Sequence, residues 1–578
     1  MRIINRPYQS EQSKFSDDVS PFLQKIFQSR GLFSDSDLNL NLTQLPSPEK
    51  LLGLVTAVDL LVDALELQQN IVIVGDFDAD GATSSALMML ALGAMGFESV
   101  DFLVPNRFDY GYGLTPEIVE LAQQKTPDII ITVDNGISSV DGVDYANQLG
   151  IKVIVTDHHL PGKQLPAAAA IINPNQPGCE FPCKNLAGVA VAFYLLSALR
   201  AKLRSNQWFE NNNLPVPNMA NYLDLVALGT VADVVPLDQV NRVLVNQGLL
   251  RIRSGRGRPG IHALLRIAGK DYSRIVASDM GFAVGPRLNA AGRLDDISRG
   301  IQCLLTDDPA QALALAQELE QLNQDRKAIE QGMQQEALKI VDSLPLDDEH
   351  ILPAALCLYQ ADWHQGVVGL LASRIKEKFH RPVAVFANDK EGILKGSVRS
   401  IPGLHIRDAL DAVATQNPGL ITKFGGHAMA AGLSLDESSF KAFEQALQQQ
   451  VMDNIEPDDL EATLKTDGEL DAHLMTKQSA ECIRDAGPWG QSFPEPSFQG
   501  TFILKSQRIV GESHLKVVLA PVDDQSQQLD GIYFNIDTNQ WPTSESRVRC
   551  VYRLDINEFR GRENLQLLIQ YMAPVNPG

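Results

Sequence analysis

The sequence predicts an α/β protein built from a parallel-sheet lobe, a long connecting helix, a second α/β lobe and a C-terminal β-barrel of the OB type. Three apolar, β-branched runs in the first third of the chain each end in a carboxylate and lead into a loop or helix, which is typical of buried parallel strands. Residues 308–343 keep helical apolar spacing, and we expect their Glu/Gln/Lys face to be solvated. Short alternating runs after residue 497 favour a small barrel.

The length of 578 residues is too great for a single core, so we expect several domains. An acid-rich stretch near residue 453 indicates one boundary. The expected divisions are an N-terminal helical segment at 1–50, a first α/β domain at 51–305, the connecting helix at 306–345, a second α/β domain at 346–452 and the barrel domain at 453–578.

The net charge of −22 argues against a general nucleic-acid binder. Residues 251–300, however, hold ten Lys/Arg against four acids, so one basic channel is compatible with the composition. No apolar stretch reaches the roughly 18 residues that span a bilayer, and the N-terminus lacks the apolar core of a signal peptide. Six scattered cysteines fit a reducing compartment, and the Cys179/Cys183 pair has no second pair at zinc-site spacing. We therefore expect a cytoplasmic protein that does not bind membranes.

The first strand candidate, 71–75, runs into an acidic turn. Asp76, Asp78 and Asp80 come at alternate positions and precede an apolar helical run. Open α/β sheets bind ligands at this end of their strands. Three crowded carboxylates repel one another, and a divalent cation such as Mg²⁺ or Mn²⁺ would offset the repulsion. The alternative is a surface acidic turn that caps a helix.

A second strand candidate, 100–105, leads into a glycine- and tyrosine-rich loop that holds Arg107 and Tyr112. Such a loop can approach a phosphate closely, and the guanidinium can clamp it. An ordinary surface loop is the alternative.

The third and fourth strand candidates also end in possible ligands. Asp134 follows one apolar run, and Asp157, His158 and His159 follow the other. Parallel strands bring such residues to one edge of the sheet. A lone histidine is more often structural, but two histidines after an aspartate at a buried strand end indicate a metal site. Imidazole ligands shift the preference toward Mn²⁺ or another transition metal.

Two later stretches carry further candidates. Asp233 lies within an apolar run, where a carboxylate needs a partner, and a metal is the obvious one. Arg287, Asn289 and Arg293 lie among glycines and alanines, where the backbone can approach a phosphate. A helix cap with exposed arginines is the alternative for this second stretch.

The second α/β lobe has its own anion-binding candidates. His364 precedes a helix N-terminus, which is a natural anion site. Ser397 and Arg399 alternate along a strand together with Lys395, and His427 lies in a glycine-rich turn. We expect these side chains to form a second phosphate-facing surface.

The motifs DFDADG, VDNG, TDHH and GTVADVVPL, in that order, resemble the four signatures of the DHH phosphoesterase superfamily. GPRLNAAGRLD, WHQGVVG, KGSVRS and FGGHAMAAG resemble its connecting region and its associated second domain, of the DHHA1 type. The length, the motif order and the C-terminal barrel are similar to those of the superfamily's single-strand-specific exonucleases. The match extends from about residue 45 to the end.

This resemblance implies a 5′-to-3′ exonuclease that hydrolyses single-stranded DNA to mononucleotides in bacterial recombination and repair. It also implies two divalent cations, Mn²⁺ or Mg²⁺. A single-strand binding protein and a helicase are implied partners, and nothing demands more than a monomer. RNA versus DNA preference stays open.

Site residues are implied one by one. The metal-ligand positions are occupied by Asp78, Asp80, Asp134, His158 and Asp233. Catalytic or supporting positions are occupied by Asp76, Asp157 and His159. The phosphate-contacting positions are occupied by Arg107, Arg287, Asn289, Arg293 and His427, to which we add Tyr112, His364, Ser397 and Arg399. The chain departs from many superfamily members at Val74, where they carry a histidine.

Three other functions fit some of these features. A short-oligonucleotide or cyclic-dinucleotide phosphodiesterase would share the four motifs but need no barrel. An inorganic pyrophosphatase would share the metal ligands in a shorter chain. A non-catalytic DNA-binding scaffold would have lost the ligands, all of which are present here.

Overall fold

The computed structural model describes residues 1–8, 13–106, 110–344, 352–390, 392–511, 513–536, 541–543, 546–559 and 561–575. The chain forms two compact units. One comprises Met1–Ile4 and Gln321–Leu464, and the other comprises Asn5–Glu320 and Lys465–Gly578. No helix in the described part of the chain is long and apolar enough to cross a membrane.

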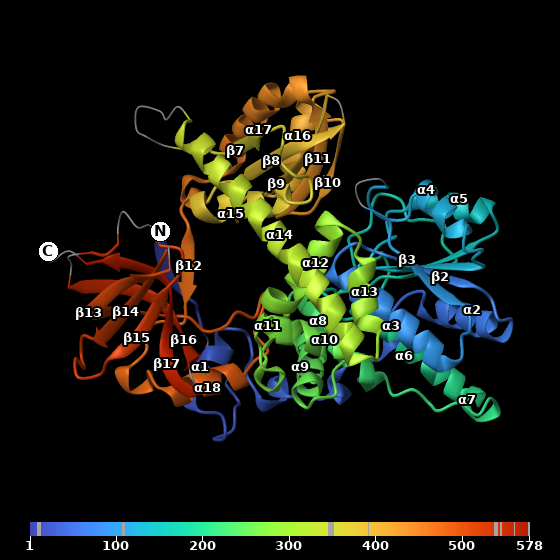
Figure 1. Ribbon diagram of the computed structural model, residues 1–578, viewed down its shortest axis with the longest axis horizontal. Coiled ribbons are helices and arrows are strands. Elements are labelled where there is room, and N and C mark those ends of the chain that lie inside the picture. The colour runs from blue at the N-terminus through green and yellow to red at the C-terminus, as the bar shows by residue number, and fades with distance from the viewer. Residues whose placement is uncertain are drawn as a thin grey trace. The chain divides into compact units, whose positions relative to one another are not determined.

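A five-stranded parallel sheet organises the larger unit, with strand order β3-β2-β4-β5-β6 (Figure 1). Its strands are β2 (Ile71–Gly75), β3 (Val100–Leu103), β4 (Ile129–Val133), β5 (Lys152–Thr156) and β6 (Ala170–Ile172). β2 and β4 are buried at every position, which explains their unbroken apolar runs. Gly75 pairs with Val133, and Val133 pairs with Thr156. The residue after each of these strands therefore lies at the same edge of the sheet.

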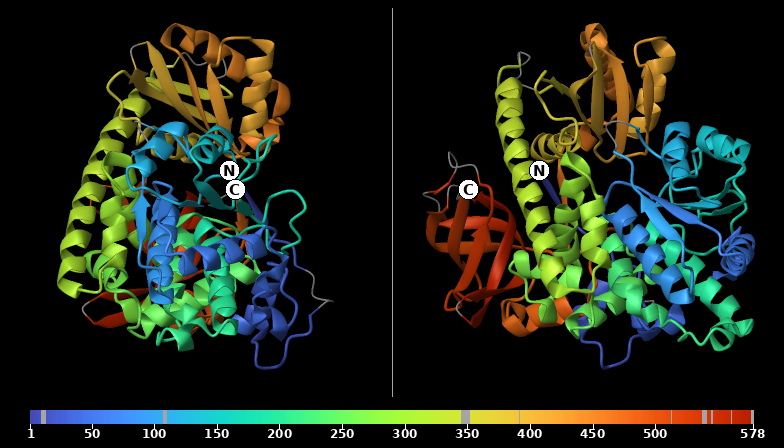
Figure 2. Two further views of the ribbon diagram at one scale, coloured as in Figure 1. Left: turned by 90° about the vertical axis from the view of Figure 1, so that its right-hand side faces the viewer. Right: turned by 45° about the vertical axis from the view of Figure 1, so that its right-hand side comes forward.

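Helices cover both faces of this sheet (Figures 1 and 2). Alternate strand residues such as Val72 and Val74 pack with α4 (Pro116–Gln123) and α5 (Val140–Gln148) in one buried cluster. The other helices that pack around the sheet or follow it are α2 (Leu54–Glu66), α3 (Ala79–Met95), α6 (Gly188–Ser205), α7 (Trp208–Asn211), α8 (Leu223–Ala232), α9 (Gln239–Arg253), α10 (Pro259–Ile267), α11 (Ala277–Asp279), the π-helical turn η7 (Met280–Val284), α12 (Gly285–Leu294) and α13 (Ser298–Leu305).

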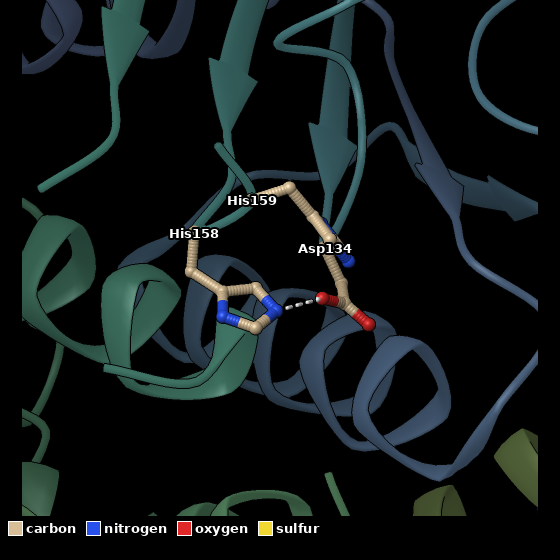
Figure 3. Close-up of side chains that lie close together, drawn as sticks. All are labelled: Asp134, His158 and His159. Carbon is tan, nitrogen blue, oxygen red and sulfur yellow. Dashed lines mark ion pairs between the residues drawn. The ribbon is translucent and has the colours of Figure 1, made fainter. Parts of the chain in front are cut away.

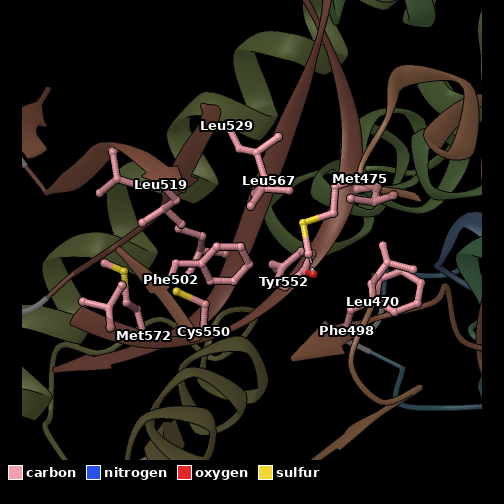
Figure 4. Close-up of a cluster of buried hydrophobic side chains, with 14 of the residues drawn as sticks. Leu470, Met475, Phe498, Phe502, Leu519, Leu529, Cys550, Tyr552, Leu567 and Met572 are labelled. Atoms are coloured by element: carbon pink, nitrogen blue, oxygen red, sulfur yellow. Dashed lines mark hydrogen bonds between the residues drawn. The ribbon is translucent and has the colours of Figure 1, made fainter. Parts of the chain in front are cut away.

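The C-terminal strands close into a barrel in the order β13-β14-β15-β17-β16. They are β13 (Phe498–Val510), β14 (His514–Pro521), β15 (Leu529–Tyr533), β16 (Arg547–Phe559) and β17 (Arg562–Pro574). Figure 4 shows the buried cluster that fills it, which includes Phe502, Tyr552 and Leu567. Helix α18 (Lys477–Asp485) adds Ala480 and Ile483 to this core.

The smaller unit has a mixed five-stranded sheet, in the order β10-β11-β9-β8-β7. Its elements are β7 (Leu356–Tyr359), α15 (Val368–Phe379), β8 (Val383–Lys390), β9 (Ile393–Arg399), α16 (Ile406–Gln416), β10 (Lys423–Gly426), β11 (Ala430–Asp436) and α17 (Phe440–Asn454). Ala384 and Phe386 of β8 pack with α16 and α17. Helix α15 lies on the opposite face (Figure 1).

The long helix α14 (Pro309–Asp342) is continuous over 34 residues (Figure 2). The sequence led us to expect a solvated polar face on this helix, but part of that face is buried. Glu330 is buried, and its carboxylate is paired with Arg326 at 2.5 Å and with Arg374 at 2.9 Å. The fold class predicted from the sequence is otherwise confirmed.

The first 50 residues are less helical than expected. They contain β1 (Arg2–Asn5), one α-helix, α1 (Pro21–Gln28), and short 3₁₀ turns. Strand β1 pairs with β12 (Thr463–Thr466), which lies more than 450 residues later in the sequence. Pairing at such separation leaves no local pattern in either segment.

Candidate metal centre

The backbone brings the strand-end residues together. The N–H groups of Asp76, Asp134 and Asp157 each donate to the last carbonyl of the next strand, at 3.3, 3.0 and 3.1 Å. Their side chains therefore start from one edge of the sheet. Asp134 holds a left-handed backbone conformation at φ 62°, which is uncommon for a residue other than glycine and is typical of strained functional positions.

The three carboxylates of the acidic turn after β2 have different surroundings. Asp78 caps α3, because its Oδ1 accepts hydrogen bonds from the N–H groups of Asp80 and Gly81 at 2.9 and 3.0 Å. Asp78 therefore caps the helix, and its carboxylate also belongs to a group with Asp76 and Asp134 that could hold a metal ion. Asp76 and Asp80 are both buried and do not act as this cap.

Asp80 is held by a second helix. Its Oδ2 accepts from the Gly188 N–H at 2.6 Å, and its Oδ1 accepts from the Val189 N–H at 2.9 Å. These amides open helix α6, whose dipole stabilises a negative charge at that end. This contact spans 108 residues of sequence and fixes the carboxylate in the centre of the site.

The His158 imidazole joins carboxylates from two different elements. Its Nε2 lies 3.1 Å from Asp134 Oδ1 and 3.4 Å from Asp233 Oδ2. Figure 3 shows the imidazole directed at the Asp134 carboxylate. Asp233 is the C-cap residue of helix α8, so this apolar helix brings the Asp233 carboxylate to the His158 imidazole.

The His159 imidazole is paired separately. Its Nδ1 lies 2.8 Å from Asp157 Oδ1, and Asp157 Oδ2 accepts from the Ile137 N–H at 2.9 Å. The Tyr112 hydroxyl lies 3.4 Å from Nε2 of the same imidazole. Asp157 thus orients His159 and stays outside the groups of side chains close enough to share an ion.

The electrostatics show crowded negative charge. Burial, and then the neighbouring Asp78, raise the pKa of Asp80 to about 7. Burial and the charge of Asp80 raise the pKa of Asp134 well above its usual range, and the pKa of Asp233 rises for the same two reasons. Without a cation, ionising this set is therefore costly.

In the Asp157–His159 pair, by contrast, the pKa shifts of both groups favour their charged forms. Burial lowers the pKa of His159, but the hydrogen bond and charge of Asp157 outweigh it and raise that pKa to about 9. Burial similarly raises the pKa of Asp157, and the hydrogen bond from His159 outweighs this effect and lowers it.

The donor set fits divalent cations. Among the described residues, three groups of side chains have ligand atoms within 4.8 Å of one another. They are Asp76/Asp78/Asp134, Asp80/His158/Asp233 and Asp134/His158/His159. The first two groups have no member in common, so the side chains offer two adjacent sites. Carboxylate oxygens with one imidazole suit Mn²⁺ and Mg²⁺.

Glycines allow the surrounding helices to approach this closely. A Cβ placed on Gly188 would lie 2.6 Å from the Asp134 Cβ, and one placed on Gly229 would lie 2.7 Å from Asp80 Oδ1. A Cβ on Gly292 would lie 1.8 Å from the Phe77 carbonyl oxygen. Helix α6 therefore packs against Asp134, and helices α8 and α12 against the acidic turn, only because these positions lack side chains.

The structure places the phosphate-binding candidates of the larger unit differently. Asn289 Oδ1 accepts from the Ala79 N–H at 2.7 Å, so this residue is part of the acidic turn's support. Arg287 is buried and forms an ion pair with Glu320 at 2.6 Å. Arg293 is half-buried in the last turn of α12. Arg107 lies outside the described residues.

The smaller unit holds four candidates from three sequence motifs. The Arg399 guanidinium donates to Ser397 Oγ at 2.9 Å, and burial lowers its pKa. A Cβ on Gly369, in the first turn of α15, would lie 2.9 Å from Arg399 Nη2 and 3.0 Å from Ser397 Oγ. His364 Nδ1 accepts from the Gly366 N–H before the same helix, and His427 N–H closes the β10–β11 hairpin through the Ala430 carbonyl.

Sequence reasoning missed the groups that hold the ligands in place. The amides of Gly188 and Val189 were not anticipated, although the glycine at the start of an otherwise apolar helix was a signal. Asn135, whose amide donates to the Val74 and Val133 carbonyls at 3.1 and 2.9 Å, was also missed. Val74 itself is buried within β2, at the position where many superfamily members have a histidine.

Three family descriptions match successive parts of the chain. They are the DHH family N-terminal domain at residues 70–230, the DHHA1 domain at 352–453 and the RecJ OB domain at 466–571. The single-stranded-DNA-specific exonuclease RecJ of Escherichia coli is 54% identical over 96% of this chain and 96% of its own length. The chain belongs to the RecJ family.

Other RecJ proteins agree with this assignment. RecJ of Haemophilus influenzae is 50% identical over 96% of both chains. The crystal structure of RecJ in complex with Mn²⁺ from Thermus thermophilus is 30% identical, with a TM-score of 0.81, and covers all of this chain and 80% of that one. A second structure of the Thermus protein, in complex with Mg²⁺, has a TM-score of 0.75. The superfamily resemblance noted from the motifs is confirmed.

Proposed function

We propose that this RecJ-family chain is a metal-dependent exonuclease that hydrolyses single-stranded DNA from the 5′ end to mononucleotides, in recombination and repair. The intact cluster of five aspartates and two histidines at one sheet edge carries this proposal. The cluster occurs in a chain that is 54% identical to a single-stranded-DNA-specific exonuclease over nearly its whole length.

Two divalent cations, Mn²⁺ or Mg²⁺, fit this centre. Asp76, Asp78 and Asp134 would hold one, and Asp80, His158 and Asp233 would hold the other. Such a pair supplies an activated water nucleophile and neutralises charge on the attacked phosphate. The Thermus structures with Mn²⁺ and Mg²⁺ support the same choice of ions.

The chain's own residues position the substrate around these ligands. The Asp157 carboxylate orients the His159 imidazole through Nδ1, and we propose that this imidazole acts on the leaving oxygen or on a non-bridging phosphate oxygen. Asn289 supports the acidic turn, and Arg293 follows in the same helix as a cation for the phosphate backbone. Arg107 and Arg287 are proposed for the same role.

A second phosphate-binding surface is proposed in the smaller unit. Ser397 and Arg399 lie against the first turn of α15, where backbone N–H groups favour an anion. The Arg399 side chain bonds only to neutral oxygens among the described residues, at Ser397 and Val398, so its charge is available to a phosphate. His364 and His427 belong to the same proposed surface.

The cellular setting is also a proposal. The protein is proposed to act as a monomer in the bacterial cytoplasm, with a single-strand binding protein and a helicase that supplies single strands. The barrel matches the RecJ OB domain, and barrels of this type commonly bind single strands.

One experiment tests the core of this proposal. Purified wild-type protein and Asp134→Ala are incubated with a labelled single-stranded oligonucleotide or a blunt duplex, with Mn²⁺ or with EDTA. We expect hydrolysis only by wild type, only of the single strand and only with the metal, while Asp134→Ala still binds the strand. Hydrolysis by Asp134→Ala at the wild-type rate would refute the metal assignment.

A further inference from the structure

Phe282 is the most exposed large hydrophobic residue in the described part of the chain, with 85% of its surface accessible. A phenyl ring gains from burial, so a ring left this open has no contribution to make to the core. Two other exposed apolar residues, Val55 and Leu67, reach only 67% and 70%. The exposure of Phe282 therefore calls for an explanation outside folding.

The ring projects from an unusual piece of helix. Phe282 lies in the π-helical turn η7, which joins α11 directly to α12. Such π-bulges are rare in proteins overall. Those that occur are often found at functional sites, because the widened turn redirects the side chains on it. The helix that follows, α12, carries Asn289 and Arg293, two of the proposed phosphate-binding residues.

Packing places this turn beside the metal centre. A Cβ on Gly281 would lie 3.3 Å from Val231 Cγ1, and one on Gly285 would lie 3.2 Å from the Ala232 Cβ. The glycine face of the turn thus rests on the last turn of α8, which ends at Asp233. Phe282 is adjacent to this face, and its ring is left in solvent.

Two further observations support this location. Further along the same helical segment, in the middle of α12, Asn289 Oδ1 accepts a hydrogen bond from the Ala79 N–H of the acidic turn. Val234, directly after Asp233, is 62% exposed and has a left-handed backbone at φ 62°, which is strained for a β-branched residue. Two exposed apolar side chains, Val234 and Phe282, therefore lie near Asp233 of the cluster.

We propose that Phe282 is a base-stacking residue that seats one nucleobase of the substrate strand beside the metal centre. The proposal rests on the exonuclease function above. Every base presents a π face, so an exposed phenyl ring binds single strands with little sequence preference. A base inside a duplex has both faces covered by its neighbours, so the same ring favours an unpaired strand.

The test pairs protein variants with abasic substrates. Binding is measured by fluorescence anisotropy in EDTA, with wild type and Phe282→Ala, on a set of single-stranded oligonucleotides that each lack one base near the 5′ end. Stacking predicts that Phe282→Ala weakens binding of the intact strand roughly 5- to 150-fold. It also predicts that one abasic position weakens binding by wild type but not by the variant.

Further variants separate stacking from general apolar contact. Phe282→Trp should retain wild-type affinity and the same abasic position dependence, and Phe282→Leu should not. Leu67→Ala is the matched control, because Leu67 is 70% exposed and follows helix α2. It should bind all strands as wild type does.

Two results would overturn the stacking role. One is unchanged binding by Phe282→Ala, and the other is an abasic penalty that is the same in wild type and variant. Failure of the exonuclease function would look different, because wild type itself would then neither bind nor degrade the intact strand.

Discussion

Mg²⁺ should bind this chain more tightly at pH 8 than at pH 6. Burial and the neighbouring Asp78 raise the pKa of Asp80 to about 7 in the folded chain, whereas an unfolded aspartate has 3.8. A raised carboxylate pKa means that folding retains a proton which the unfolded chain releases. This contribution to stability is therefore fully present below about pH 4 and is lost as the pH rises through 7.

The size of the effect follows from the same shift. With the pKa of Asp80 raised to about 7, ionising this group in the metal-free protein above pH 7 costs about 4 kcal/mol relative to an ordinary aspartate. At pH 6 a cation must first displace that proton, at a cost of about 1.4 kcal/mol, and at pH 8 the cost is close to zero. Mg²⁺ affinity should therefore rise about tenfold between these pH values through Asp80 alone.

Titration calorimetry measures this directly. Mg²⁺ binding is followed at pH 6 and pH 8, each in two buffers of different ionisation enthalpy, which gives the number of protons released. We expect about one more proton released at pH 6 than at pH 8, and urea unfolding should show a larger gain from Mg²⁺ at pH 8. An affinity and a proton count that do not change with pH would refute this reading of the cluster.

Two other predictions concern packing and phosphate binding. Gly188→Ala places a methyl group 2.6 Å from the Asp134 Cβ, so it should lower the free energy of unfolding by about 1–3 kcal/mol and reduce hydrolysis. Gly93→Ala, in a helix position with nothing within 4 Å, is its control and should be neutral or stabilising in urea unfolding. Arg399→Ala should weaken single-strand binding about 10- to 100-fold and reduce the salt dependence of the affinity, unlike Arg407→Ala on exposed helix surface. Equal effects of the two variants in either pair would contradict the corresponding contact.

The strand-end positions of the candidate site residues were predictable because their signals are local. A buried parallel strand is a continuous apolar run, so Asp76, Asp134 and His158 could be assigned to strand ends without knowing the fold. Asp233 was recognisable because an acid within an apolar helix needs a partner, and the structure places it 3.4 Å from His158.

The missed features depend on contacts between distant segments. Asp80 is held by amides 108 residues away, and β1 pairs with β12 across most of the chain. Arg287 was assigned to a phosphate contact from its glycine- and alanine-rich surroundings, and nothing in that segment indicates its ion pair with Glu320. No spacing rule within one segment reveals such partners, because they are set by how helices pack on the sheet.

The most direct test of the proposed exonuclease uses one single-stranded oligonucleotide, labelled in turn at its 5′ and 3′ ends and incubated with Mn²⁺. The account predicts early release of a mononucleotide from the 5′ label, slow shortening seen from the 3′ label, and no release in EDTA. Early release from the 3′ label, or cleavage only of very short fragments, would contradict it and would leave the barrel without a role.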